Sequence, residues 1–416
     1  MSRNNDIKVL VINCGSSSVK FQLINMSNEN VLAGGIVERL GLPQSIIKFK
    51  FGDKDLTREC GALDHNSAIS EIIDGITHGL FGVLSHKSEI SAVGHRVVHG
   101  AEQFTESVLI TDDTIRQIEA CIELAPLHNP HNLKGILVCK ELLPGVPQVA
   151  VFDTAFHQTM EDYVYTYALA YKYYEKYRFR RYGFHGTSHF YVANKAAEIV
   201  GKDISKLKII TCHLGNGASI AAVKYGKSID TSMGFTPLEG LIMGTRCGDV
   251  DPAMVLFVME KEHLCPHECD TLMNKESGLI GISGISSDMR DIIKAYEDGN
   301  DRARLALQMY SYRIRKYIGM YAASMNGVDI IVFTGGVGEK AVLIRSMCCT
   351  DMEYLGIDFD EKKNKKTVGT EGELTAQGSK VRVLCIPTNE ELVIARDTAR
   401  IIDNKIGRRL FYCSFV

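Results

Sequence analysis

The sequence lacks a strong excess of charge of either sign, a long basic run, and any apolar segment of membrane length. Its 47 Lys and Arg residues face 50 Asp and Glu residues, which leaves a formal net charge of −3. This near balance argues against a nucleic acid or an anionic membrane surface as the partner. A membrane helix needs roughly 18 consecutive apolar residues, and no segment approaches that length. We therefore expect a soluble protein without nucleic-acid or membrane partners.

A secretory signal and low-complexity linkers are also missing from the sequence. The polar start, residues 1–8, leads into only a short apolar run. The 12 cysteines of this long chain do not read as a disulfide scaffold, so we expect them to be free thiols in a reducing compartment. These features predict a cytoplasmic protein.

Two cysteine-containing segments leave alternatives open. Residues 263–269 place His263, Cys265, His267 and Cys269 close together, whereas zinc sites usually join two separated pairs of ligands. A surface turn is therefore favoured over a structural metal. Residues 413–416 have the outline of a prenylation box, but Ser and Val are unusual in their positions. The sequence does not assign a role to the 407–416 tail.

Short apolar runs that end in glycine-containing or polar turns recur along the chain. Residues 8–13 and 19–24 are predicted strands around a turn at 14–18, and the same strand–turn–strand pattern returns at 208–223. Further strands are predicted at 148–152, 328–334 and 381–386, with turns at 335–338 and 387–390. The two similar openings suggest two similar halves.

Helical periodicity separates these strands. Apolar residues recur at three- and four-residue spacing in four stretches, 112–124, 189–200, 302–323 and 391–403. Alternating strands and helices, with hairpins opening two blocks, indicate α/β domains with mixed sheets. A length of 416 residues suggests two or three domains.

The first glycine-bearing turn combines several groups that suit a phosphate. Asn13, Ser16, Ser18 and Lys20 place an amide, two hydroxyls and an ammonium around one loop. Backbone N–H groups and a lysine can surround phosphate oxygens, although serine-rich turns are also good turns in themselves. Because the turn lies between two strands, it is not a Walker-type loop.

Two arginines in short glycine-flanked segments indicate an anion site. Arg96 lies in 94–100 and Arg246 in 243–249, and a buried guanidinium must find an anion. The alternative for each is a buried arginine–carboxylate pair. Asp153, at the end of an apolar strand, and His185, between two glycines, are further candidates for this site.

Eleven segments in this order resemble the acetate kinases, within the superfamily of acetate and sugar kinases, Hsp70 and actin. They span nearly the whole chain at residues 9–20, 94–100, 125–130, 151–157, 182–189, 213–217, 230–240, 244–252, 287–291, 333–339 and 387–391. The resemblance implies two RNase H-like domains with mixed sheets facing a central cleft. It places residues 1–153 plus 391–416 in the first domain and residues 154–390 in the nucleotide-binding second domain. It also implies a homodimer.

The resemblance further implies the roles of individual residues. Asn13 and Glu390 would hold Mg²⁺, with Mn²⁺ as the alternative cation, and Asp153, His185 and Arg246 would carry catalysis. Arg96 would bind the substrate carboxylate, and an apolar wall would hold the methyl group, formed by Val98, Leu127, Phe184 and Pro237. The nucleotide would contact Ser16, Ser18, Lys20, His213, Leu214, Gly215, Asn216, Gly217, Asp288, Met289, Arg290, Gly336, Val337, Gly338, Glu339 and Lys340.

The activity that the resemblance implies is reversible, Mg²⁺-dependent transfer of the γ-phosphoryl group of ATP to acetate. Val98 favours acetate over propionate, because related propionate kinases tend to have a smaller residue there. A propionate kinase and a pyrophosphate-dependent acetate kinase are the alternatives within the family. A non-catalytic, nucleotide-gated binding protein is the alternative from another class, but it would not need Arg96, Asp153, His185 and Arg246 together. The sequence does not fix the physiological direction or the phosphoryl donor.

Overall fold

The computed structural model describes residues 7–52, 54–77 and 82–403. By internal contacts the chain divides into two compact units, Met1–Ala155 with Asn389–Val416, and Phe156–Thr388. The limits of the functional domains, expected at 153/154 and 390/391, stay a prediction. The 407–416 tail, with its cysteine at 413, lies outside the described residues. Of the helices in the described ranges, none is long and apolar enough to span a bilayer.

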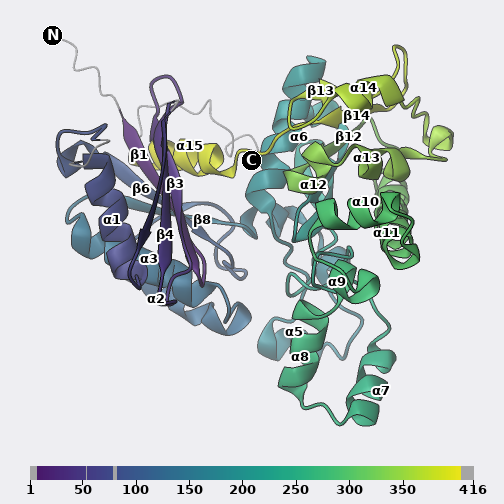
Figure 1. Ribbon diagram of the computed structural model, residues 1–416, viewed down its shortest axis with the longest axis horizontal. Helices are drawn as coiled ribbons and strands as arrows, with labels where there is room; N and C mark the ends of the chain where they lie inside the picture. The colour runs from purple at the N-terminus through teal and green to yellow at the C-terminus, as the bar shows by residue number, and fades with distance from the viewer. Residues whose placement is uncertain (1–6, 53, 78–81, 404–416) are drawn as a thin grey trace. The chain divides into compact units, whose positions relative to one another are not determined.

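The first unit is built on an eight-stranded mixed sheet with the order β5-β4-β3-β2-β1-β6-β8-β7 (Figure 1). Its strands are β1 (Lys8–Cys14), β2 (Ser18–Asn25), β3 (Asn30–Glu38), β4 (Ser45–Phe51), β5 (Lys54–Cys60), β6 (Ala92–Val97), β7 (Val108–Leu109) and β8 (Gln148–Phe152). Strands β1 to β5 form an antiparallel meander, whereas β1, β6 and β8 run parallel. The carboxyl ends of β1, β6 and β8 therefore meet at one edge of the sheet.

Helices cover both faces of this sheet. They are α1 (His65–Thr77), α2 (Asp112–Ala120), α3 (Asn129–Leu142) and α15 (Glu390–Ile402), with short 3₁₀ turns at Lys87–Glu89 and Ile122–Leu124. Strand β1 shows why both faces are covered: Leu10 and Ile12 belong to one buried cluster with α1 and α3, whereas Val9 and Val11 belong to another with α15. The alternation of side chains along a strand distributes its apolar residues to two cores.

The second unit holds a six-stranded mixed sheet with the order β11-β10-β9-β12-β14-β13. Its strands are β9 (Lys208–Leu214), β10 (Ala218–Lys224), β11 (Lys227–Thr231), β12 (Ile330–Thr334), β13 (Gly372–Glu373) and β14 (Arg382–Cys385). Strands β9, β10 and β11 are antiparallel neighbours, and β9, β12 and β14 run parallel. Five strands thus repeat the order and directions of β3-β2-β1-β6-β8, which confirms the predicted α/β class with two mixed sheets.

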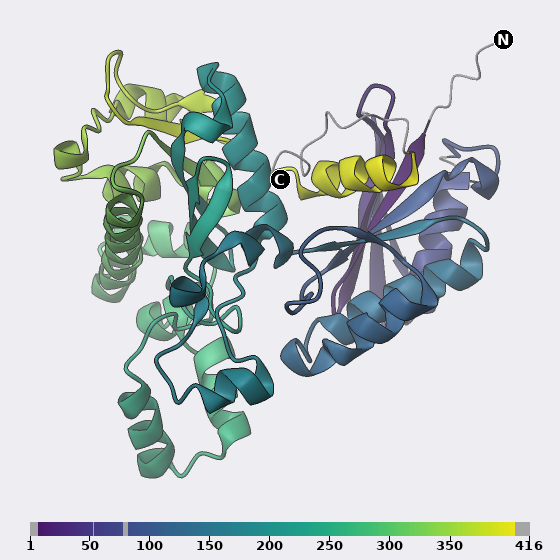
Figure 2. The ribbon, with the colours of Figure 1, turned by 180° about the vertical axis from the view of Figure 1, so that it is seen from behind.

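Eleven α-helices of the second unit are described, and α6 and α11 pack against β9 from opposite sides of the sheet (Figures 1 and 2). The helices are α4 (Asp162–Tyr165), α5 (Lys172–Tyr177), α6 (Gly186–Val200), α7 (Pro252–Glu262), α8 (Pro266–Lys275), α9 (Gly278–Ser283), α10 (Met289–Glu297), α11 (Asp301–Met325), α12 (Gly335–Lys340), α13 (Val342–Cys349) and α14 (Glu361–Lys366). Short 3₁₀ helices lie at Ala155–Thr159, Ile204–Lys206 and Glu353–Leu355.

Two local predictions were wrong. Residues 335–338, expected as a turn, open the short helix α12, because the Glu339 side chain accepts a hydrogen bond from the Gly335 N–H at 3.0 Å and caps that turn. The helix expected over 112–124 is interrupted: α2 ends at Ala120, and residues 122–124 tighten into a 3₁₀ turn.

A buried histidine in the first sheet makes stability depend on pH. His95 on β6 is 2 % exposed, and its Nε2 lies 2.6 Å from the side-chain amide of Gln148. Burial lowers the pKa of His95 from 6.5 to about 4, although the contact with Gln148 opposes this effect. The unfolded chain therefore takes up a proton near pH 6.5 that the folded chain takes up only near pH 4.

We expect the free energy of unfolding to fall as the pH drops from 6.5 to 4, by on the order of 3 kcal/mol from His95. His95→Gln should weaken this pH dependence by that amount, as measured by urea unfolding at pH 7 and pH 4. The exposed His267 provides the control, since His267→Gln should leave the dependence unchanged. An identical pH dependence for His95→Gln and the native chain would contradict the assignment.

Candidate active site

The site residues of the first unit gather where β1, β6 and β8 end. Arg96 on β6 donates from Nε to Asp153 Oδ1 at 3.0 Å and from Nη2 to Asp153 Oδ2 at 2.6 Å. Asp153 follows β8 and is 1 % exposed. The alternative left open for Arg96, a buried ion pair, is therefore present. Its Nη1 has no protein partner in the described part of the chain, so the guanidinium keeps donors for a second anion.

Charge is concentrated at this edge of the sheet. Burial lowers the pKa of Arg96, but the negative charges of Asp153, Glu390 and Glu391 raise it by more, so the guanidinium stays protonated. Burial raises the pKa of Glu390, the first residue of α15, to about 7. The nearby charge of Arg96 lowers it, and that of Asp153 raises it. Because burial is the main cause of the raised pKa, a cation bound beside Glu390 would favour its ionised form.

The β1–β2 hairpin brings its four predicted residues to the same unit. Asn13 pairs with Lys20 in the ladder, Ser16 lies in the connecting turn and Ser18 begins β2, and Gly15 N closes the turn on Ser18 O at 2.8 Å. Ser16 and Lys20 are exposed. The hairpin therefore presents the Ser16 hydroxyl and the Lys20 ammonium to solvent.

Two asparagines of α3, which sequence reasoning did not single out, fix the strand ends. Asn132 donates to the carbonyl of Cys14 at 2.7 Å and accepts from the N–H of Val98 at 3.0 Å, so it ties the end of β1 to the end of β6. Asn129 bonds both backbone groups of His99. The sequence signal was an Asn pair three residues apart at a helix start, which alone is too common to mark a site.

The chemistry of this edge fits a hard divalent cation. Mg²⁺ is usually held by one or two carboxylates together with waters and substrate phosphates. The amide oxygen of Asn13, at the end of β1, and the carboxylate of Glu390, at the start of α15, are donors of this kind. No cluster of three or more His, Cys, Asp or Glu side chains able to hold a metal occurs in the described ranges.

In the second unit, Arg246 and His185 lie beside the turn between β9 and β10. The position of a Cβ atom on Gly217 is 3.5 Å from Arg246 Nη1 and 3.6 Å from His185 Cε1. The guanidinium of Arg246 donates to the carbonyl of Pro237 at 3.1 Å, and the described residues include no carboxylate within ion-pair distance of it. Burial lowers its pKa. Arg246 is thus a half-buried cation that has no counter-ion among residues 7–52, 54–77 and 82–403, which is a favourable place for an anionic ligand.

A network of histidines orients His185. Its Nδ1 lies 2.8 Å from Ser219 Oγ, which in turn lies 2.7 Å from Nε2 of the buried His189. Burial, together with His157 and His213, holds the pKa of His189 well below its usual value, so that ring is neutral. The ring of His213 stacks on that of His185 with centroids 4.3 Å apart. Of these histidines, sequence reasoning identified 185 and 213 and missed the support from 189.

The carboxyl ends of β9 and β12 border a pocket of about 710 Å³ in the second unit. Eight of its lining residues were predicted as nucleotide contacts, namely Gly215, Asn216, Asp288, Met289, Arg290, Gly336, Val337 and Lys340. Leu279, Ser287, Ile293 and Ala341 complete the lining and were not predicted. His213, Leu214, Gly217, Gly338 and Glu339 do not line it.

Two charged residues, Glu339 and Arg345, bind the backbone of the glycine-rich segment 335–339 beside this pocket. Glu339 accepts hydrogen bonds from Gly335 N at 3.0 Å and Thr388 N at 3.2 Å, so its role in this structure is a cap. Arg345, 0 % exposed, donates to the carbonyls of Gly338 and Glu339 at 2.9 and 2.8 Å. No sequence pattern indicated Arg345, because its donors bind backbone carbonyls and the side-chain amide of Asn364.

The four residues expected to form the apolar wall are divided between the units. Val98, 7 % exposed, and Leu127, 62 % exposed, belong to the first unit. Phe184, 3 % exposed, and Pro237 belong to the second. The carbonyl of Phe184 lies 3.0 Å from Nε2 of the buried His157, which fixes the backbone before His185.

The cysteine- and histidine-containing segment 263–269 caps two helices. His263 ends α7 in a left-handed conformation with φ of 55°, and Cys265 precedes α8, where its N–H donates to Glu268 at 2.8 Å. Cys265 is exposed and Cys269 is buried.

Comparison with known proteins agrees with this fold. The sequence profile of the Acetokinase family matches residues 8–396. An acetate kinase of Halothermothrix orenii is 56 % identical over 399 residues, which cover 96 % of this chain and 100 % of the relative. The crystal structure of Porphyromonas gingivalis acetate kinase has a TM-score of 0.92 at 52 % identity, covering 95 % of this chain and 100 % of that one. A propionate kinase structure from Francisella tularensis reaches a TM-score of 0.89 at 41 % identity, covering 95 % and 100 %.

Fold and relatives together define an enzyme of the phosphotransferase class, built on the actin-like ATPase fold. Within that class, the chain belongs to the acetokinase family.

Proposed function

We propose that the protein catalyses reversible, Mg²⁺-dependent transfer of the γ-phosphoryl group of ATP to acetate, giving acetyl phosphate and ADP. The observation that carries this proposal is the Arg246 guanidinium beside His185 and the 215–217 turn, without a protein counter-ion in the described chain. The family membership of the chain supports the substrate pair.

The proposed chemistry asks little of the protein beyond placement and charge. A carboxylate is ionised at pH 7, so no strong base is needed to make acetate a nucleophile. We propose that Arg96 binds the carboxylate with the donors that Asp153 leaves over, and that Arg246 and His185 stabilise the charge on the phosphoryl oxygens. Asp153 would orient the guanidinium of Arg96, and the β1–β2 hairpin with Ser16, Ser18 and Lys20 would contact the transferred phosphate.

The cation and the nucleotide are assigned to separate residues in this proposal. Asn13 and Glu390 would hold Mg²⁺, or Mn²⁺ in its place. When bound, the cation neutralises charge on the phosphoryl group that is transferred. The pocket of about 710 Å³ is large enough for an adenosine and carries Asp288 and Arg290 at its rim. Residues 213–217 would contact the phosphates. We also propose that the protein works in the cytoplasm, where a reducing environment would keep its free cysteines reduced.

A donor-by-acceptor activity matrix tests the proposal. ATP, GTP and pyrophosphate are each combined with acetate, propionate and butyrate in the presence of Mg²⁺, and acyl phosphate is trapped as the hydroxamate. We expect the highest kcat/KM for ATP with acetate. Preference for propionate or for pyrophosphate would establish one of the two alternatives. Failure to form any acyl phosphate would indicate a non-catalytic, nucleotide-gated binding protein.

Val98 is expected to set the preference between acetate and propionate. It is almost fully buried, lies two residues beyond Arg96, and is held by the hydrogen bond from its N–H to Asn132. One methylene in an apolar pocket is worth about 1–3 kcal/mol. Val98→Ala should therefore raise the propionate-to-acetate ratio of kcat/KM about tenfold. Val149→Ala, a core change on β8, is the control and should lower stability without changing that ratio. An unchanged ratio in Val98→Ala would exclude Val98 from the pocket.

An apolar face on the second unit supports the proposal that the protein is a homodimer. Helix α7 has no buried residue, and Met254, Leu256 and Phe257 are 51 %, 67 % and 59 % exposed. An isolated helix of this length is marginal in water, so α7 would gain stability from a cover. We propose a second copy of the chain as that cover. Sedimentation velocity should give a dimer for the native chain and a monomer for Phe257→Asp. Leu305→Asp, at an exposed position of α11, is the control and should leave the dimer intact, and a dimeric Phe257→Asp would contradict this surface.

A further inference from the structure

The segment that carries Arg246 is a loop whose two ends are joined. Gly240 N donates to Asp249 Oδ1 at 2.7 Å, and Asp249 N donates to the carbonyl of Gly240 at 3.0 Å. Residues 240–249 thus form a closed loop with Arg246 inside it. Gly240 and Gly248 have φ of 106° and 69°, and a Cβ on either would lie 2.4 Å from a carbonyl oxygen, so both positions require glycine.

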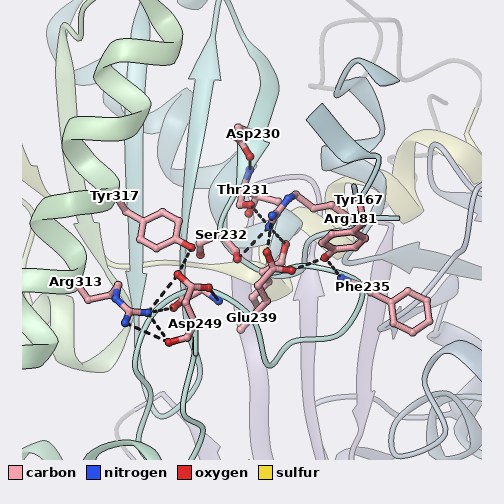
Figure 3. A network of polar contacts seen from close by, with 12 residues as sticks. Tyr167, Arg181, Asp230, Thr231, Ser232, Phe235, Glu239, Asp249, Arg313 and Tyr317 are labelled. Carbon is pink, nitrogen blue, oxygen red and sulfur yellow. Dashed lines mark hydrogen bonds and ion pairs between the residues drawn. The ribbon is translucent and has the colours of Figure 1, made fainter. Parts of the chain in front are cut away.

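Helix α11 holds the neck of this loop. Arg313 pairs with Asp249 Oδ2 at 3.2 Å and donates to the carbonyl of Gly240 at 3.0 Å. The hydroxyl of Tyr317 donates to Asp249 Oδ2 at 2.7 Å. The Asp249 carboxylate therefore accepts from the loop with one oxygen and from the helix with the other, as Figure 3 shows.

A second set of contacts holds the segment just before the loop. Arg181 pairs with Glu239 Oε1 at 2.6 Å and donates to the carbonyls of residues 231–233. Tyr167 donates to Glu239 Oε2 and accepts from Phe235 N at 2.9 Å (Figure 3). This set fixes the backbone around Pro237, whose carbonyl receives the Arg246 guanidinium.

The middle of the loop is tied to the segment 274–280. The carbonyls of Met243, Gly244 and Thr245 accept from the N–H groups of residues 279, 280 and 277 at 2.8, 3.0 and 3.1 Å, and Thr245 Oγ1 donates to Asn274 O at 2.8 Å. Met243 N donates to the Arg246 carbonyl at 3.1 Å, Gly244 N donates to the carbonyl of Asn216 at 2.9 Å, and Cys247 N donates to Met273 O at 3.0 Å. These bonds hold the middle of the loop, and the contacts of Asp249 with Gly240, Arg313 and Tyr317 hold its two ends. Catalysis by charge stabilisation tolerates little displacement, since an error of about 1 Å can cost 10²-fold in rate.

We propose that Asp249, held by Arg313 and Tyr317, is a positioning residue for phosphoryl transfer. It closes the loop and thereby sets where the guanidinium of Arg246 lies. The inference rests on the proposed catalytic role of Arg246 and adds to it a residue that does not touch the reacting atoms.

Asp249→Ala should lower kcat about 10²-fold, while the KM for ATP changes by less than about threefold. Asp249→Asn, which keeps the oxygen that accepts from Gly240 N, should recover about tenfold of that loss. The control is Glu373→Ala, which breaks the Arg382–Glu373 pair of the same unit at 2.7 Å and should leave kcat unchanged. Unfolding transitions of both alanine variants show whether their losses of stability are comparable.

A double-mutant cycle separates positioning from general destabilisation. If Asp249 acts through Arg246, Asp249→Ala has no further effect on kcat in an Arg246→Ala background. Independent, multiplying effects would overturn the inference. Should Asp249→Ala fail to fold, Tyr317→Phe removes one hydroxyl and is expected to lower kcat severalfold, and again not in the Arg246→Ala background. If Tyr317→Phe and Asp249→Asn each keep the native kcat, the inference is overturned even when Arg246→Ala is inactive. Native kcat in Arg246→Ala would instead overturn the proposed function of Arg246 itself.

Discussion

Replacing Arg246 by alanine is expected to lower kcat for acetyl phosphate formation by about 10³-fold or more while the affinity for ATP stays nearly unchanged. Among the described residues no carboxylate neutralises this guanidinium, so its charge is available to the phosphoryl oxygens. The charge on those oxygens changes most in the transition state, so the lost interaction should appear in kcat. The pocket bordered by Asp288 and Gly336 does not include Arg246, so nucleotide binding should survive.

Steady-state kinetics in both directions and calorimetric titration with ATP would measure the two quantities. Arg304→Ala is a matched control, because Arg304 lies exposed on α11 and pairs only with exposed partners. A kcat for Arg246→Ala within about tenfold of the native value would remove Arg246 from the reaction.

Arg96→Ala is expected to raise the KM for acetate by about 10- to 150-fold, the equivalent of one charge-assisted hydrogen bond of 1.5–3 kcal/mol. The same change should also reduce the free energy of unfolding by about 3–5 kcal/mol, because it leaves the carboxylate of Asp153 buried and unpaired. Substrate binding and stability are thus coupled in one side chain, and a single variant cannot separate them.

A second variant separates the two effects. In Arg96→Ala with Asp153→Asn, the buried charge is gone, so the stability should recover while the KM for acetate stays high. Arg58→Ala, which removes half of an exposed pair with Glu71, should change neither quantity measurably. If the acetate KM of Arg96→Ala equals the native value, Arg96 serves only as the partner of Asp153.

Much of the fold follows from local sequence patterns. The β1–β2 and β9–β10 hairpins were predicted to within a residue or two, because alternating apolar residues on either side of a glycine turn allow few other structures. Helix α12 was not predicted, because three of its first four residues are glycines, which disfavour a helix. The hydrogen bond from Gly335 N to the Glu339 side chain, which offsets this preference, is visible only in the structure.

The site could be predicted less completely, for a physical reason. Whether Arg96 meets a substrate or an acid depends on the register of β6 against β8, which places Val97 opposite Phe152 and so brings Arg96 to Asp153. That register joins segments far apart in sequence and leaves no local pattern. The same holds for Asn132, whose two hydrogen bonds connect three separate elements.

Arg345 has a consequence that reaches beyond its hydrogen bonds. The fully buried side chain directs its donors at the carbonyls of residues 338, 339, 364 and 367 and the amide oxygen of Asn364. Those dipoles solvate the cation without cancelling it, so a full positive charge persists underneath the glycine segment. A polyphosphate bound next to that segment would be attracted electrostatically by the Arg345 guanidinium without contacting it. Arg345→Lys would preserve the charge but leave most of these carbonyls without a hydrogen-bond donor, since an ammonium cannot reach four of them in a plane.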